Sequence, residues 1–122
     1  MKKLVFTAAI LLAVAFGADA QKAKKVKLEQ TPGAFTTTEL TLKAGKPYVF
    51  EVSNNGVDHE VGFVVAPSDK TNQANHIKNA YVTKMIKDGE SSQSKEVVLE
   101  AGEYVYFCPM NPTPQYKIVV KE

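Results

Sequence analysis

The sequence predicts an all-β fold, a β-sandwich of about seven short strands with a short helical insertion. Apolar and polar residues alternate along most of the chain after residue 24, and this period of two is typical of strands with one buried face. Turn signals at residues 44–47 (AGKP) and 100–102 (EAG) separate the alternating runs. A chain of 122 residues suits one domain with one hydrophobic core.

The alternation places the strands and the core in chain order. The expected strands cover residues 25–29, 39–42, 48–52, 59–65, 96–99, 103–108 and 116–121. Successive side chains point to opposite faces of a strand, so apolar residues of equal parity share the buried face. The expected core comprises Leu40, Leu42, Phe50, Val52, Val61, Phe63, Tyr104, Tyr106, Ile118 and Val120.

Residues 67–92 interrupt this pattern. Ile77, Tyr81 and Met85 lie four residues apart, a spacing that places them on one face of a helix. We therefore expect one or two helical turns between two strands.

Residues 1–20 have the features of a cleaved signal peptide. A basic start (MKK) precedes an apolar run at residues 4–16, and Ala18 and Ala20 are the small residues expected before a cleavage site. The apolar run is short for a bilayer span. We expect a mature domain of residues 21–122 that is periplasmic or secreted and has no membrane span.

Charge and composition argue against several functions. The formal net charge is +2, and every basic residue is lysine. Without arginine the chain lacks the usual bidentate reader of phosphates and bases, so we expect no nucleic-acid binding. Neither a glycine-rich phosphate loop nor a zinc-type cysteine pair occurs. A Cys-His nucleophile would need further polar groups that nothing signals, so we do not expect an enzyme.

Cys108 is the only cysteine, so it has no disulfide partner within the chain. It shares a strand face with Tyr104 and Tyr106, and His59 begins another strand on the face of Phe63. Thiolate and imidazole together suit copper or zinc. From the residues alone, Cys108 could be a metal ligand, a buried small hydrophobe or a thiol for another molecule.

Three segments resemble plastocyanin-type cupredoxins. Residues 54–59 (NNGVDH) look like the first copper-histidine segment, and 89–92 (GESS) look like the turn before the penultimate strands. Residues 100–109 (EAGEYVYFCP) resemble the closing hairpin, which ends in an aromatic residue and the copper cysteine. The resemblance spans the mature chain, with an insertion at about residues 68–87. It implies a Greek-key cupredoxin-like fold, copper as the metal, and His59 and Cys108 as ligands.

The chain departs from that family in its ligand loop. The family uses a second histidine a few residues after the cysteine and a methionine further on. Here the third residue after Cys108 is Asn111, and Glu60 replaces the asparagine that commonly follows the first histidine. A blue-copper plane of two histidines and one cysteine therefore cannot be assembled from this loop.

Met110 and His76 are the candidate substitutes. The Met110 thioether suits Cu(I), although a methionine in such a loop more often caps the core. His76 lies in the insertion, where solvation is the alternative interpretation. We expect a metal site of His59, Cys108 and Met110, with copper as the cofactor.

Two functions follow. The first is an exported copper-binding protein, an electron carrier or a Cu(I) binder, that meets a redox or copper-transfer protein partner. The second is a metal-free cupredoxin-fold module that binds a protein through residues 108–116, where Pro109, Pro112 and Pro114 stiffen the loop.

Overall fold

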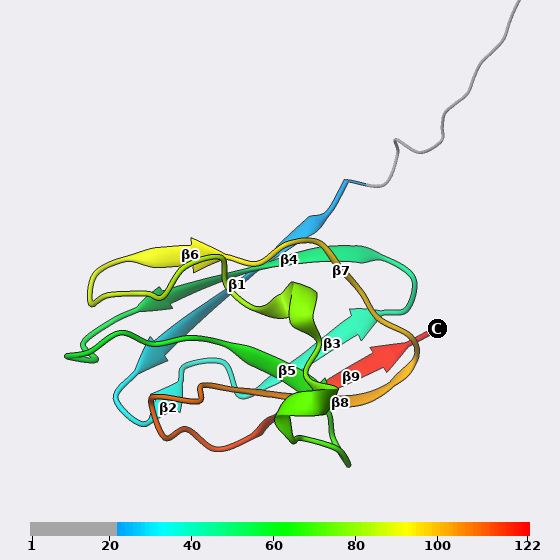
Figure 1. Ribbon diagram of the computed structural model, residues 1–122. Helices are drawn as coiled ribbons and strands as arrows, with labels where there is room; N and C mark the ends of the chain where they lie inside the picture. Colours follow the sequence, from blue (N-terminus) through cyan, green and yellow to red (C-terminus); the bar gives the residue numbers. More distant parts are fainter. Residues whose placement is uncertain (1–21) are drawn as a thin grey trace, which may run out of the picture.

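The computed structural model describes residues 22–122 and shows two β-sheets packed face to face (Figure 1). The first sheet contains β1 (Lys24–Thr31), β2 (Ala34–Phe35), β4 (Pro47–Asn54), β6 (Ser91–Gln93) and β7 (Val97–Val98). The second contains β3 (Glu39–Lys43), β5 (Val64–Pro67), β8 (Gly102–Phe107) and β9 (Tyr116–Lys121). Strand β1 pairs with β4, and β3 with β9, in parallel, whereas the other pairs are antiparallel. The predicted all-β sandwich is confirmed.

The core lies between the sheets and follows the predicted parity. Eight of the ten expected core residues are buried, and Leu40 and Tyr104 are partly buried against that core. Its centre is aromatic, since the Phe63 ring packs against Phe35, Phe50 and Tyr106 at centroid distances between 5.2 and 6.1 Å. Alternation therefore predicted which strand faces meet.

The strand expected at residues 59–65 begins later than predicted. Strand β5 starts at Val64, and the residues before it form a loop in which Val61 makes an isolated β-bridge to Ile86. Val61 and Ile86 exchange two backbone hydrogen bonds of 2.9 and 3.0 Å. These bonds pair the segment with the chain before β6 rather than with β8, so His59 lies in a loop and does not begin a strand.

The insertion is helical only in short 3-10 turns. They are η2 (Gln73–Asn75) and η3 (Lys78–Ala80), each three residues long. The Ile77 N–H between them donates to the Val65 carbonyl at 2.8 Å, so the segment is tied to the edge of β5. The predicted helical insertion is thus confirmed, but Met85 lies beyond both turns rather than on their face.

One end of the sandwich gathers the loops that follow β1, β4 and β8, at the left in Figure 1. His59 and Cys108 both belong to these loops. The predicted signal peptide lies outside the described residues and stays a prediction. None of the helical turns within residues 22–122 has the length and apolar character needed to cross a membrane.

Candidate metal centre

Cys108 lies directly after β8, and its side chain is only 4% exposed. Its Sγ accepts three backbone N–H groups, from Gly62 at 3.4 Å, Met110 at 3.4 Å and Asn111 at 3.2 Å. Three N–H dipoles directed at one sulfur offset the negative charge that a metal-bound thiolate carries, and such bonds tune thiolate–metal sites. The sulfur therefore lies in a pre-formed polar cradle at the edge of an apolar core.

The loop after Cys108 is held by short-range bonds. The Cys108 N–H donates to Thr113 Oγ1 at 3.1 Å, and the Thr113 N–H donates to the Asn111 carbonyl at 2.6 Å. These bonds close a compact turn whose prolines fix φ at three positions.

Asn111 connects this loop to β1. Its side chain is 2% exposed, accepts the Gly33 N–H at 2.8 Å, and donates to Gln30 Oε1 at 3.1 Å and to the Thr31 carbonyl at 2.9 Å. Gln30 in turn donates to the Gly62 carbonyl at 2.7 Å. Both polar atoms of the Asn111 amide thus make hydrogen bonds. Asn111 therefore joins this loop to β1 and the turn after it, at a position where the family has a ligand.

The hydrogen bonds of Asn111 were not predicted from the sequence, although one signal was present. Gln30 has the same parity as Leu28 and is fully buried, and a polar residue on a core face needs a hydrogen-bond partner. The identity of that partner depends on the tertiary fold, since Asn111 is 81 residues away.

His59 and Met110 are placed differently from Cys108. The His59 ring is exposed, and its Nδ1 lies 3.0 Å from the carbonyl oxygen of the adjacent Glu60. Met110 directs only its backbone N–H at the sulfur, and its side chain is 52% exposed. The structure thus brings the backbone of Met110 to the thiol and leaves both candidate ligand side chains at the surface. Their joint ligation with Cys108 remains a prediction.

His76 is half-buried rather than solvated. Its Nδ1 lies 2.8 Å from the Tyr81 hydroxyl and its Nε2 lies 3.1 Å from the Thr71 carbonyl oxygen. The ring also meets Phe107 edge-on at a centroid distance of 6.0 Å. With both nitrogens engaged, His76 stabilises the insertion. It borders a hollow of about 360 Å³ whose lining also includes Val64, Gln73, Tyr81 and Pro109.

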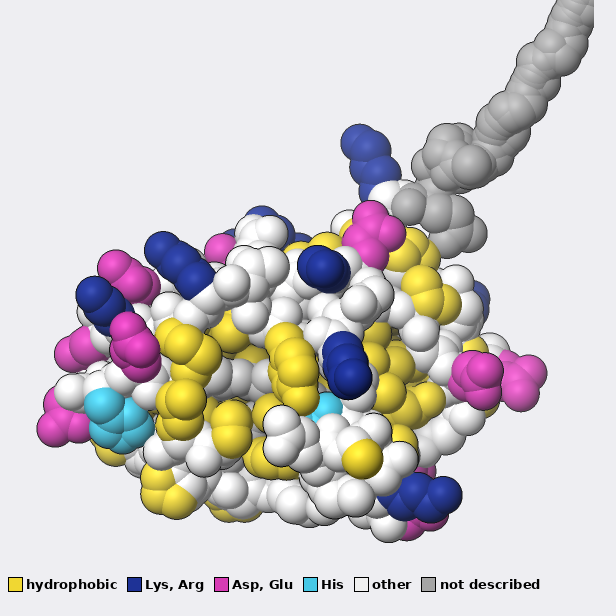
Figure 2. Space-filling view, viewed as in Figure 1, with side chains coloured by type: hydrophobic (Ala, Val, Ile, Leu, Met, Phe, Trp, Pro, Cys, Tyr) yellow, Lys and Arg dark blue, Asp and Glu magenta, His cyan; other side chains and the backbone are white. Residues whose placement is uncertain are grey.

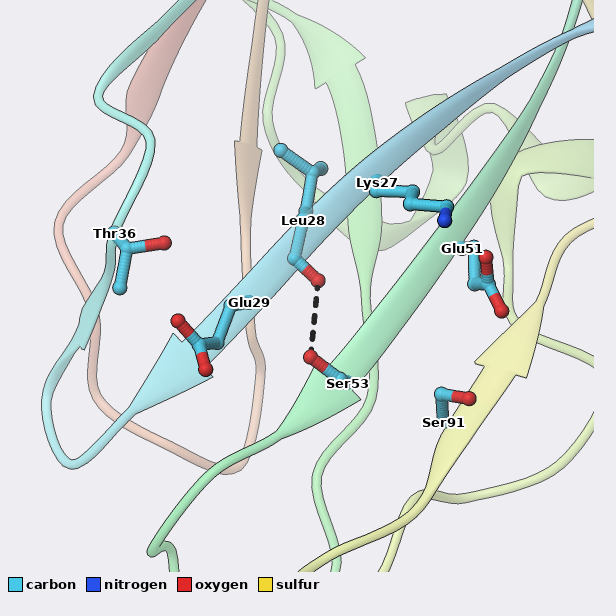
Figure 3. A pocket seen from close by; sticks show the side chains of 7 residues that line it. All are labelled: Lys27, Leu28, Glu29, Thr36, Glu51, Ser53 and Ser91. Carbon is cyan, nitrogen blue, oxygen red and sulfur yellow. Dashed lines mark hydrogen bonds between the residues drawn. The ribbon is translucent and has the colours of Figure 1, made fainter.

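A second hollow, of about 290 Å³, lies over β1, β4 and β6, away from the thiol (Figure 3). Lys27, Glu29 and Glu51 bring charges of both signs to it, and Ser53 Oγ donates to the Leu28 carbonyl at 3.5 Å. Figure 2 likewise shows charges of both signs around the rim of one face, with apolar side chains across its middle. No single sign of charge dominates either region.

The side-chain donors near Cys108 can be compared with the ligands that copper prefers. Within residues 22–122 there is no group of three or more His, Cys, Asp and Glu residues that could hold a metal ion. The two-imidazole site of a blue-copper protein therefore does not fit this chain. Methionine thioethers are outside that count, and a cradled thiol with thioethers in nearby segments fits the preference of Cu(I) for soft ligands.

The chain matches the family model of the cupredoxin-like domain over residues 4–120. It belongs to the cupredoxin family, as the resemblance of its loops and closing hairpin implied.

Solved structures show the same fold. An auracyanin B structure is 18% identical, with 82% of this chain and 90% of that chain covered and a TM-score of 0.66. Auracyanin A of Chloroflexus aurantiacus, titled a "blue" copper protein, is 20% identical, with 79% and 98% covered and a TM-score of 0.61. Auracyanin of Roseiflexus castenholzii is 16% identical, with 80% and 97% covered and a TM-score of 0.62. No curated protein matches the chain significantly.

Proposed function

We propose that this cupredoxin is an exported Cu(I)-binding protein whose principal ligand is the Cys108 thiolate. The observation that carries the proposal is the buried Sγ with three backbone N–H donors. A small hydrophobe would need no such cradle, whereas a thiolate bound to a cation retains negative charge that these dipoles stabilise. We assign the chain a binding role rather than a catalytic one.

His59 and Met110 are the further ligands in this proposal. Both side chains are exposed, so neither is locked by packing in an orientation away from the thiol. One thiolate, one thioether and one imidazole form a soft donor set on balance, which favours Cu(I) over Cu(II). Bound copper would supply one-electron chemistry or be the cargo that is passed on.

The relatives of this fold and the predicted export of the chain agree with a copper-binding role. Auracyanin A, a "blue" copper protein, is the precedent within the fold for binding copper. The predicted signal peptide would deliver the chain to the periplasm or the exterior. There a redox or copper-transfer protein would be its partner.

Competition with a Cu(I) chelator under anaerobic, reducing conditions tests the proposal. The native protein should take up one Cu(I), and subsequent oxidation should not produce the intense blue colour of a thiolate–Cu(II) site, because the two-histidine plane is absent. Cys108→Ser, which keeps a small acceptor for the three N–H groups, should weaken Cu(I) binding by about a hundredfold or more. His59→Ala and Met110→Leu should each weaken it less. Unchanged affinity in the serine variant, with a native circular dichroism spectrum, would refute a copper site at Cys108.

A metal-free binding module is the second candidate, and one observation favours it. Met110 is 52% exposed and stands among exposed prolines in a loop that Asn111 locks from below. A rigid loop with an exposed apolar tip can meet a protein without an ordering cost. Copper content after dialysis of protein purified from the exported fraction separates the candidates, since only the copper binder should retain the metal.

A further inference from the structure

Met85 approaches the Cys108 cradle from the segment before β6. Its side chain is half-buried and lies over Gly62, the residue whose N–H donates to Cys108 Sγ. A methyl group added at Gly62 would lie 3.2 Å from Met85 Cε and 3.7 Å from its Sδ. It would also lie 3.9 Å from Pro109 Cδ, in the residue that follows the cysteine. Gly62 is therefore the common neighbour of the thiol and the Met85 thioether.

The missing side chain at Gly62 makes this approach possible. Gly62 is buried, and its backbone shows no left-handed φ, so turn geometry does not require a glycine here. A Cβ at this position would press against the end of the Met85 side chain, which would have to shift by a few tenths of an ångström. The absence of a side chain at Gly62 thus leaves room for the Met85 thioether next to the backbone that donates to Cys108 Sγ.

Both methionines within residues 22–122 have atoms beside Cys108 or beside Gly62, which donates to it. Met110 places its N–H on the Cys108 sulfur, and Met85 covers the residue that places the second N–H there. Thioether and thiolate are the ligand types that select Cu(I). The described chain offers no second imidazole at this end, because both nitrogens of His76 are engaged in the insertion.

We propose that Met85 is a copper ligand, so that Cu(I) is held by the three sulfurs of Cys108, Met85 and Met110, with the thiol proton released to solvent. This inference rests on the proposed copper-binding function and specifies its site. In this site the Met85 thioether replaces the His59 imidazole of the ligand set proposed above, and the affinities of Met85→Leu and His59→Ala distinguish the two sets.

Selenium labelling can test Met85 directly. In selenomethionine-labelled Met110→Leu protein lacking residues 1–20, Met85 is the only selenium site. After loading with Cu(I) alone, X-ray absorption at the copper edge should show a selenium neighbour together with the Cys108 sulfur. The labelled Met85→Leu/Met110→Leu double variant is the control and should show no selenium neighbour.

Affinity provides a second, independent measurement. Met85→Leu retains the volume but not the donor, and should weaken Cu(I) binding about tenfold or more, while His59→Ala weakens it less. Gly62→Ala should weaken it as well, since the added methyl displaces the end of Met85 and leaves the Gly62 N–H in place.

The outcomes separate the two proposals. Copper bound through sulfur without a selenium neighbour in the Met110→Leu protein, and full affinity in Met85→Leu, would overturn the role of Met85 and leave Cys108 as the anchor. Failure of the native protein to bind Cu(I) would overturn the copper-binding function itself.

Discussion

The Cys108 segment (residues 108–113) and the His59 segment (residues 55–60) lie at the same end of the sandwich but are held in different ways. In the Cys108 segment the side chains carry the bonds: the sulfur accepts three N–H groups and the Asn111 amide makes three further hydrogen bonds. In the His59 segment the fixed groups are largely backbone. The Gly56 N–H donates to Asp88 Oδ1, and the His59 carbonyl accepts from Asn54.

This difference matters for the chemistry of the site. A side chain held by several partners is preorganised and loses little conformational entropy when it binds a metal. An exposed ring must first lose rotational freedom. The thiol is therefore ready to bind, and the imidazole is not. A resemblance in sequence places both residues in the same kind of loop, but it does not reveal how firmly each side chain is held.

Alternation was enough to predict the sandwich and most of its core, because a period of two translates directly into buried and exposed faces. It was less informative where strands are short. Strands β2 and β6 have two and three residues, too few to show a pattern, and neither was expected. The late start of β5 likewise depends on the pairing of Val61 with Ile86.

The candidate site was predicted only in part. The position of Cys108 at the inner end of β8 followed from parity and proved correct. The Gln30–Asn111 pair and the contact of Met85 with Gly62 join residues far apart in the chain. The spacing of Met85 indicated a helix face. No local pattern could show that its side chain lies over Gly62, which donates to Cys108 Sγ.

The largest expected effect in this comparison comes from removing the Asn111 amide, which joins the Cys108 segment to β1. Asn111→Ala deprives the buried Gln30 oxygen, the Thr31 carbonyl and the Gly33 N–H of their partner. Leaving buried polar groups unsatisfied costs about 1–3 kcal/mol each, and partial solvation of two of them reduces the sum. We expect the free energy of unfolding, measured by denaturant titration, to fall by about 2–4 kcal/mol.

Asn55→Ala is the matched control in the His59 segment. Asn55 is exposed and donates to Glu29 Oε2 at 2.8 Å, so its loss should change the free energy of unfolding by less than about 0.5 kcal/mol. Equal losses at Asn111 and Asn55 would contradict the difference between the segments.

Alkaline pH should destabilise the fold through Tyr106, which lies in β8, the strand that precedes Cys108. Burial, and secondarily the nearby Tyr116, raise the pKa of Tyr106 to about 12, while in the unfolded chain tyrosine titrates near its ordinary value of about 10. The folded state therefore favours the neutral phenol, whose hydroxyl donates to the Thr37 carbonyl. This contribution is fully present below pH about 10 and is lost as the pH rises towards about 12.

Denaturant titrations between pH 9 and 12 would measure this loss. The native protein should lose stability with pH more steeply than Tyr106→Phe, which lacks the ionisable hydroxyl. Tyr106→Phe is the reference because it shows the pH dependence that the rest of the chain contributes. Parallel curves would show that Tyr106 does not contribute.

The smallest expected effect on stability is that of His59→Ala. The ring is exposed and its Nδ1 bonds only to the adjacent carbonyl oxygen, so the free energy of unfolding should change by less than about 0.5 kcal/mol. Its effect on Cu(I) affinity then decides between two kinds of site, because stability cannot confound the measurement. A loss larger than that in Met85→Leu would show that the exposed imidazole turns inward to become a main ligand. A smaller loss would show that the Cys108 thiolate and the methionine thioethers hold the ion, as the contrast between the two segments predicts.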